Sequence, residues 1–302
     1  MKILITGAAG YIGSLLAEKL STQDLLLVDD YSACTDGRPR IEKVGRNHIV
    51  EADISSEAVC QELLKGIDVI YHFAATSGIA KCEDPASYKN NVVGTSNIGA
   101  AALRNGCRKI IFASTSAVYG ESQCYFINEN HRIKPRCKYG WEKYIGELIL
   151  QSLGIPIVIL RKSNVYGDGL FHKKTAVDVF IDKAMNGEDI TIDGTGLQRR
   201  DYVHLNDTVD AYIQSLYWDS GVYNIGGLDN MSVNELADII ISYVYKSGGK
   251  LVKKIFNEQA DAGRMLKKFS YDITRAMSIG YKPKERVINE VTRRVGGHRC
   301  KP

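Results

Sequence analysis

The chain has few of the features that indicate a metal site, a disulfide framework or a membrane span. Its seven cysteines occur without a C-x-x-C pair, and its six histidines show no metal-ligand spacing. No apolar run reaches the roughly 18 residues that a transmembrane helix needs. The N-terminal MKILITG lacks the apolar core and cleavage site of a signal peptide. We therefore expect reduced thiols, no metal, no membrane partner and a cytoplasmic location.

Basic residues are concentrated at the C-terminal end. The net charge is only +4, yet residues 250–302 contain 14 Lys or Arg against 5 Asp or Glu. Such an excess can attract an anionic ligand or simply be solvated. No nucleic-acid motif accompanies it, so we expect no nucleic-acid partner.

The first half of the chain alternates short apolar runs with helix-length segments. The runs are KILIT, LLLVD, HIVEA, VIYHFA, KIIFAS and IPIVILR. Val, Ile and Leu dominate them, which predicts buried parallel strands in a doubly wound α/β sheet of the Rossmann type.

After SNVYGDG, near Gly169, this rhythm changes to isolated elements. They are a helix over 177–186, strands at DITID and RDYVH, and a helix from Asp207. Ser232 and Glu235 form a capping box that opens a further apolar helix. We predict a nucleotide-binding domain over 1–168 and a smaller α/β substrate domain over 169–302, with chain segments crossing back between them.

The motif TGAAGYIG stands between the first apolar run and the following helix. Gly7 allows a tight turn, Gly10 lets the backbone approach a pyrophosphate, and Gly13 lets the helix pack on the strand. Asp29 follows Gly7 by 22 residues at the end of the second run. A carboxylate there binds ribose hydroxyls and repels a 2′-phosphate. Because no arginine follows it before Arg38, the pattern favours NAD over NADP.

A tyrosine and a lysine lie four residues apart in YGWEK. On a helix this spacing places Tyr139 and Lys143 on one face. A nearby ammonium favours the phenolate and lowers a tyrosine pKa from its usual value of about 10. Exposed helices also carry such pairs by chance, so the surrounding motifs decide between a catalytic and a surface pair.

Taken together, these motifs resemble those of the extended short-chain dehydrogenases/reductases, the nucleotide-sugar epimerase and dehydratase family. The resemblance covers nearly the whole chain. The matching stretches are GAAGYIG, EADI, FAA at 73–75, NNVVGT, STSAVYG, YGWEK, RKSNVYG and RRDYVH.

The resemblance implies NAD as cofactor and assigns a role to each matching position. Tyr139 is the acid-base residue, Lys143 lowers its pKa and holds the nicotinamide ribose, and Thr115 hydrogen-bonds the same substrate oxygen. Asn164 and Arg200 hold the diphosphate of a nucleotide-diphosphate sugar. The residues implied for NAD are Gly7, Gly10, Tyr11, Ile12, Gly13, Asp29, Asp53, Ile54, Phe73, Ala74, Ala75, Asn91, Tyr139 and Lys143.

The residues after Thr115 bear on the reaction. Family dehydratases and decarboxylases usually carry an acidic residue two positions after this threonine, and 3,5-epimerases carry a cysteine there, whereas this chain has Ala117. A 4-epimerase is therefore expected, acting by transient oxidation at C4 and return of hydride to either face. An NAD(P)H-dependent 4-ketoreductase is the alternative. A non-catalytic NAD-binding regulator would usually lack the tyrosine or the lysine.

The chain also departs from the family pattern at two positions. Family members often carry an R-x-G-D-like stretch before the final helices, where this chain reads DAGRMLKKFSYD, so Arg264 is an out-of-register candidate for the missing arginine. Lys162 stands where many epimerases have an aromatic or aliphatic residue near the nicotinamide. The sugar and the base therefore stay open. His204 is expected to be a packed core histidine.

Assembly is a further expectation from the resemblance. Related enzymes pair two helices across a two-fold axis, and the corresponding segments here are CEDPASYKNNVVGTSNIGAAALRNG and KYGWEKYIGELILQSLG. A homodimer is expected. Ile145, Leu148 and Leu150 belong either to that interface or to the monomer core, a choice that the pattern leaves open.

Overall fold

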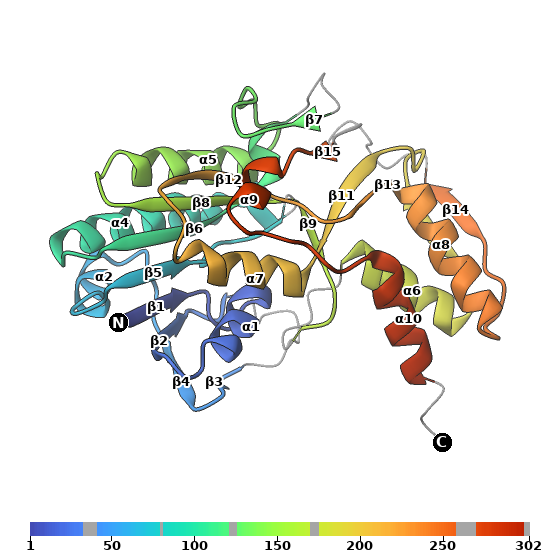
Figure 1. The fold of residues 1–302 in the computed structure, drawn as a ribbon, viewed down its shortest axis with the longest axis horizontal. Coiled ribbons are helices and arrows are strands. Elements are labelled where there is room, and N and C mark those ends of the chain that lie inside the picture. Colours follow the sequence, from blue (N-terminus) through green and yellow to red (C-terminus); the bar gives the residue numbers. More distant parts are fainter. Residues whose placement is uncertain (33–40, 79–80, 121–125, 170–174, 258–269, 299–302) are drawn as a thin grey trace.

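The computed structural model describes residues 1–32, 41–78, 81–120, 126–169, 175–257 and 270–298 (Figure 1). Its larger part is built around an eight-stranded sheet. In spatial order the strands are β12 (Gly221–Ile225), β8 (Ile157–Lys162), β6 (Lys109–Thr115), β5 (Val69–His72), β1 (Lys2–Thr6), β2 (Asp24–Asp29), β4 (Asn47–Glu51) and β3 (Lys43–Val44). Neighbouring strands are parallel except β3 and β4. The predicted doubly wound sheet is confirmed.

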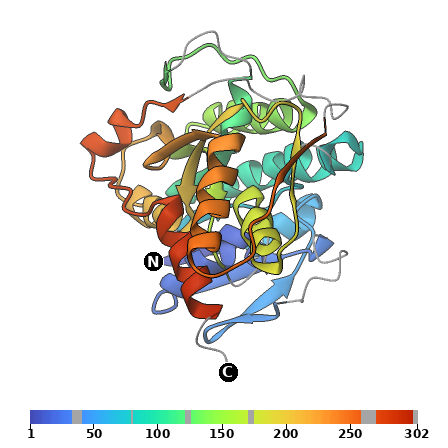
Figure 2. The same ribbon diagram turned by 90° about the vertical axis from the view of Figure 1, so that its right-hand side faces the viewer.

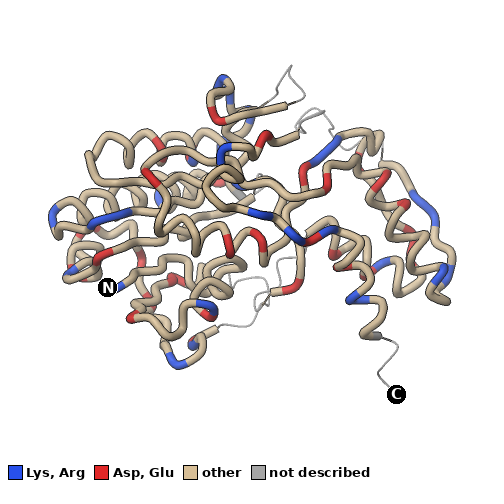
Figure 3. Tube along the Cα trace, viewed as in Figure 1, with Lys and Arg blue, Asp and Glu red and all other residues tan. Residues whose placement is uncertain are grey.

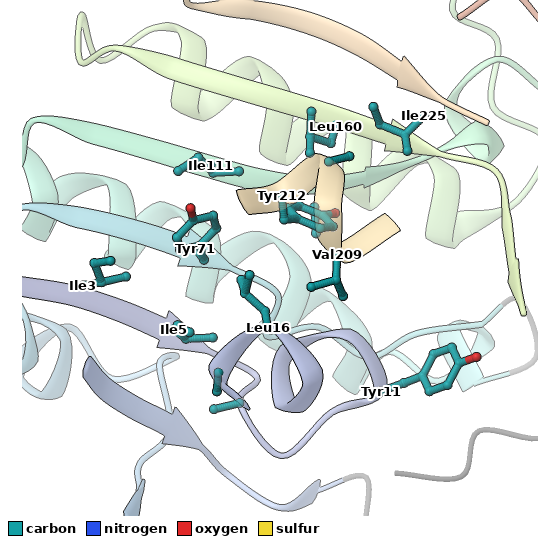
Figure 4. Packing of buried hydrophobic residues seen from close by; sticks show 14 of the residues in the cluster. Ile3, Ile5, Tyr11, Leu16, Tyr71, Ile111, Leu160, Val209, Tyr212 and Ile225 are labelled. Carbon is teal, nitrogen blue, oxygen red and sulfur yellow. The ribbon is translucent and has the colours of Figure 1, made fainter. Parts of the chain in front are cut away.

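Helices cover both faces of this sheet. On one face lie α1 (Tyr11–Lys19) and α7 (Leu205–Ser215), and on the other lie α2 (Glu57–Leu63), α4 (Gly94–Arg104) and α5 (Lys138–Gln151). Alternate residues of β1 point to the helices on opposite faces of the sheet. Ile3 and Ile5 pack toward α1, as Figure 4 shows, and Leu4 packs toward α2 and α4. Burial on both faces explains why these strands are continuous apolar runs.

A smaller unit, built from two short sheets and three helices, lies beside the large sheet (Figure 2). Its strands are β9 (Asn164–Tyr166), β11 (Arg199–His204) and β13 (Asp229–Ser232) in one sheet, and β10 (Ile190–Asp193) with β14 (Lys254–Asn257) in another. Around them pack α6 (Ala176–Asn186), α8 (Val233–Lys246) and α10 (Val287–His298). The predicted capping box opens α8, with both reciprocal hydrogen bonds between Ser232 and Glu235.

The chain passes between the two units more than once. After β11 it returns to the large sheet as α7 and then as the edge strand β12, before β13 and α8 resume the smaller unit. The short elements α3 (Ala86–Tyr88), β7 (Phe126–Ile127), β15 (Ser270–Tyr271) and α9 (Thr274–Ser278) complete the described fold. The edge strand β12 of the large sheet thus lies beyond the predicted domain boundary at 168/169. That boundary stays a prediction.

Several of the described basic C-terminal residues form ion pairs. Arg286 pairs with Asp229, and Arg294 bridges Asp178 at 2.8 Å and contacts Asp182. Figure 3 shows charges of both signs in this part of the molecule. Within the described ranges no helix combines the length and apolarity needed to cross a bilayer.

Candidate active site

Two cavities lie at the carboxyl ends of the large sheet's strands. The strand order reverses between β1 and β5, and at such a point the chain diverges to leave a crevice. The first cavity, of about 190 Å³, opens there. Its walls come from the turns after β1, β2 and β5 and from α5, and are Gly7, Gly10, Tyr11, Ile12, Gly13, Val28, Asp29, Asp30, Ser32, Ala52, Ile54, Phe73, Ala74, Ala75, Ser77, Asn90, Ala113, Tyr139, Lys143 and Lys162.

The glycine-rich turn leaves no room for side chains at two of its glycines. Gly7 has φ +71°, and a Cβ on it would lie 2.7 Å from the Ala74 nitrogen. A Cβ on Gly13 would lie 2.2 Å from the Gly7 carbonyl oxygen. The close approach keeps the start of α1 against β1, with its first-turn N–H groups toward the cavity. This is the backbone geometry that binds a pyrophosphate.

Asp29 closes one side of this cavity. Its carboxylate accepts hydrogen bonds from the backbone N–H groups of Ala9 and Tyr31, both at 2.9 Å. Burial raises the pKa of Asp29, and these two bonds oppose the rise. The carboxylate is thus held at the end of β2, as expected for binding ribose hydroxyls. Arg38 lies outside the described residues.

Two of the expected NAD residues are placed differently from the others. Ile54 lines the cavity, whereas Asp53 is not part of the lining. The Asp53 carboxylate instead accepts hydrogen bonds from the Ser55 N–H at 2.8 Å and from the Lys89 ammonium at 3.1 Å. Asn91 is fully buried, where its side-chain oxygen accepts the Thr76 N–H at 2.8 Å. Its neighbour along the chain, Asn90, lines the cavity instead, and the resemblance gave no signal for it.

The second cavity, of about 590 Å³, lies between the two units. One wall comes from the ends of β6 and β8 and the start of α5, and the other from the smaller unit. The described residues that line it are Tyr11, Ile12, Gly78, Thr115, Ser116, Ala117, Gly120, Arg136, Cys137, Tyr139, Lys162, Ser163, Asn164, Val165, Tyr166, Thr175, Ala176, Val177, Phe180, Thr191, Ile192, Asp193, Gln198, Arg200, Tyr202 and Val233. It thus brings Thr115, Tyr139, Asn164 and Arg200 into one space.

The predicted catalytic residues meet at the start of α5. Tyr139 and Thr115, which ends β6, both line the larger cavity, and the Thr115 side chain is close enough to lower the pKa of the tyrosine. Lys143, one turn further along the helix, is buried with its ammonium 4.1 Å from the centre of the Phe112 ring. Tyr139 lines both cavities and Lys143 only the first. The pair therefore shares one helix face, as the four-residue spacing predicts.

Burial dominates the electrostatics of this pair. It raises the pKa of Tyr139 above its usual value, the Thr115 side chain opposes this rise, and Cys82 and Glu142 add to it. Burial also lowers the pKa of Lys143 to about 7, against the charges of Glu147 and Glu142. Burial thus opposes the ionisation that the lysine and the nicotinamide ring together are expected to favour, and that expectation stays a prediction.

Two buried carboxylates on α5, Glu142 and Glu147, oppose the fall in the pKa of Lys143, and the sequence analysis missed both. Glu142 accepts hydrogen bonds from Ser87 and Asn91, each at 2.7 Å. Glu147 forms a two-point ion pair with Arg161 of β8, at 3.0 and 2.6 Å, and also bonds Ser114. Charged residues at such positions of a helix usually lie on its exposed face, so the sequence gave no sign that these two are buried.

The residues expected at the diphosphate lie on the far side of the second cavity. Burial lowers the pKa of Arg200, whose guanidinium donates to the Arg199 carbonyl at 2.9 Å. The Asn164 amide donates to the Asp201 carbonyl at 3.1 Å. Arg264 lies outside the described residues. His204, almost fully buried, caps the N-terminus of α7 and is a packed histidine as expected.

Comparison with known proteins agrees with this architecture. Residues 3–226 match the model of the NAD dependent epimerase/dehydratase family. The chain belongs to this family. NAD is accordingly its cofactor, and the first cavity has a glycine turn and a carboxylate, Asp29, that fit such a dinucleotide.

Relatives within the family catalyse more than one reaction. A putative UDP-glucose 4-epimerase of Methanocaldococcus jannaschii is 34% identical over 95% of this chain and 97% of its own length. Among solved structures, UDP-glucose 4-epimerase from Thermotoga maritima with UDP-glucose is 28% identical, with a TM-score of 0.86 over 99% of both chains. UDP-glucuronic acid 4-epimerase from Bacillus cereus with UDP-glucuronic acid and NAD is 29% identical, with a TM-score of 0.83 over 98% of both. Decarboxylases and dehydratases are also relatives.

Lys143→Met is expected to stabilise the protein without added nucleotide, most strongly in mild acid. The pKa of Lys143 falls from 10.5 to about 7 on folding, so its buried charge costs stability fully below pH 7. That cost declines as the pH rises from about 7 toward 10.5, because the folded protein then releases the proton first. Melting temperatures measured from pH 6 to 9.5 should show a gap between variant and wild type that narrows with pH. A gap independent of pH would contradict the buried charge.

Proposed function

We propose that this enzyme is a nucleotide-sugar 4-epimerase. The observation that carries the proposal is the position of Tyr139, which lines both the NAD cavity and the larger cavity and shares the larger one with Thr115. A substrate with its 4-hydroxyl between these two side chains places C4 beside the dinucleotide site. The larger cavity then has room for the sugar and its diphosphate on the side of Asn164 and Arg200.

The chain's own residues handle the proton in this mechanism. Tyr139 removes the proton of the 4-hydroxyl, Thr115 holds the oxygen, and the ammonium of Lys143 favours the phenolate. Bound NAD supplies a hydride acceptor, and its positive ring adds to the field that offsets the burial of Tyr139. Tyr139 returns the proton after the sugar has turned its other face. The cycle is redox-neutral and uses no external reductant.

The residues next to Thr115 favour epimerisation over dehydration or decarboxylation. The position where those relatives usually have an acidic residue is Ala117, which lines the cavity. Asp193 is the only acidic residue among the described residues of this lining, and it belongs to β10 on the opposite wall. Among these described residues, none on the wall of Tyr139 offers the cavity a carboxylate that could help eliminate a substrate group.

The test is a panel of nucleotide sugars incubated with the purified enzyme and no added reductant. UDP-glucose, UDP-N-acetylglucosamine, UDP-glucuronic acid and dTDP-glucose would be followed by NMR for the C4 epimer, for released CO2 and for 4-keto-6-deoxy products. Formation of a C4 epimer supports the proposal. Turnover only of a 4-keto sugar with added NADH or NADPH would instead identify the alternative, a 4-ketoreductase.

We also propose that the enzyme works as a homodimer through the outer faces of α4 and α5. These helices pack side by side, and large apolar side chains of this region remain exposed in the monomer, namely Tyr88, Val93, Leu103, Trp141 and Leu148. Leu150 is fully buried in the monomer core, and Leu148 faces outward. An exposed apolar face of this kind is typical of a contact with another molecule.

Leu148→Glu combined with Trp141→Glu is expected to give a monomer in light scattering at micromolar concentration, where the wild type is a dimer. Two buried charges in a small symmetric interface cost far more than they do on a solvated face. Leu251→Glu is the matched control, since Leu251 is exposed after α8 on the other unit. A wild-type monomer, or an equal effect of the control, would contradict this interface.

A further inference from the structure

Lys162 lies where the two cavities meet. It is the last residue of β8, and four of the described residues line both cavities, namely Tyr11, Ile12, Tyr139 and Lys162. In the proposed reaction the nicotinamide ring and the sugar carbon approach each other at this junction, since hydride transfer needs the reacting atoms in contact. Lys162 thus brings a cation to the place where hydride moves. Lys143, in contrast, lines the first cavity alone.

The surrounding strands anchor this side chain. Successive residues of a strand point to opposite faces, so Arg161 enters the buried pair with Glu147 and Lys162 turns toward the cavities. Lys162 is aligned with Thr115 in the pairing of β6 and β8. Its ammonium donates a hydrogen bond to the Ser114 carbonyl at 2.9 Å. The position of the charge is therefore set by the strand pair that carries Thr115.

We infer that Lys162 shifts the bound cofactor toward its reduced form. The nicotinamide ring carries a positive charge in NAD⁺ and none in NADH, so a cation fixed nearby repels only the oxidised ring. In the first half of the reaction C4 is oxidised, its hydride passes to the ring and its hydroxyl proton passes to Tyr139. A cation at the junction favours this half and opposes the return. The inference rests on the proposed function only for the location of the ring.

A purely structural role makes a different prediction. If Lys162 only joined β8 to β6 through the Ser114 carbonyl, its loss would lower stability and weaken NAD⁺ and NADH equally. The relative affinity for the two oxidation states separates these roles. Substrate is not needed for that measurement.

The experiment uses the full-length protein equilibrated with equimolar NAD⁺ and NADH until the bound composition is constant. Free nucleotide is then removed by gel filtration, and the released NAD⁺ and NADH are quantified by chromatography. Lys162→Met and Lys162→Gln are expected to lower the bound ratio of NADH to NAD⁺ by about tenfold. Lys162→Arg keeps the charge and should keep the wild-type ratio. The control Lys65→Met alters an exposed lysine just after α2 that lines neither cavity, and it should leave the bound ratio unchanged.

An unchanged ratio in both uncharged variants would overturn the inference. So would a shift in Lys162→Arg equal to that in Lys162→Met, because the effect would then follow the shape of the side chain and not its charge. Failure of the sugar panel to yield a C4 epimer would count against the proposed function but would leave this ratio as measured.

Discussion

Tyr139→Phe is expected to lower C4 epimerisation by about 10²- to 10⁴-fold while leaving NAD bound. The replacement keeps the ring volume and removes only the phenol oxygen of a residue that lines both cavities. Turnover is measured by NMR on the sugar that the panel identifies. Bound NAD is measured after denaturation, and folding by the melting temperature.

Tyr144→Phe is the matched control. Tyr144 lies on the same helix, but it packs against the cluster of Val118, Tyr119, Ile127 and Tyr271 and lines neither cavity. Its loss of a hydroxyl should leave turnover near wild type. If Tyr139→Phe retained wild-type turnover, or if both variants lost activity equally, the acid-base role of Tyr139 would be wrong.

Arg161→Met is expected to destabilise the protein by about 3–5 kcal/mol, because it leaves the Glu147 carboxylate buried without its cation. The pair is almost fully buried, with the closest nitrogen–oxygen distance 2.6 Å. Arg161 also donates to the Tyr119 hydroxyl at 3.0 Å, and that hydroxyl donates to Asn224 of β12 at 2.7 Å. Unfolding free energies from urea titrations would measure the loss.

Two further variants show whether burial is the cause. Arg104 and Glu57 form a pair of the same length, 2.6 Å, but both side chains are more than half exposed. Arg104→Met should therefore cost less than about 1 kcal/mol. In the Arg161→Met background, Glu147→Leu should restore part of the lost stability by removing the unpaired charge. A loss from Arg161→Met no larger than that from Arg104→Met would show that the buried pair contributes little.

The parts of the fold that local chemistry determines were predictable. Gly7 and Gly13 occupy positions where no side chain fits, so their spacing marks the turn directly. The spacing of Tyr139 and Lys143 places both on one helix face whatever surrounds them. Likewise, the capping box of Ser232 and Glu235 is complete within four residues. Each of these signals is contained in a short stretch of sequence.

What the sequence left undetermined depends on contacts between distant segments. Ser87 and Asn91 come from a different part of the chain to bury Glu142, so the sequence analysis gave no sign of this carboxylate. Spacing reveals a charge neighbour of Tyr139 but not its depth of burial, so the sequence gave no sign of the rise that burial brings to the pKa of this tyrosine. Asn90 and Asn91 are identical in type, and only the packing of the helix decides which one faces the cavity.

The return of the chain to the large sheet limits how the wall around the sugar can be exchanged between related enzymes. A chimera with a single crossover near residue 169 would import α7 and the edge strand β12 together with that wall. The imported strand would then meet the resident β8, Tyr119 and Arg161 without having been selected to match them. Recombination in two inserts, over 175–204 and 229–257, would transplant β10, β11, β13 and β14 with α6 and α8 and leave the eight-stranded sheet with its own edge. The residues of β9, α7, β15 and α10 that face these inserts would then need to be matched.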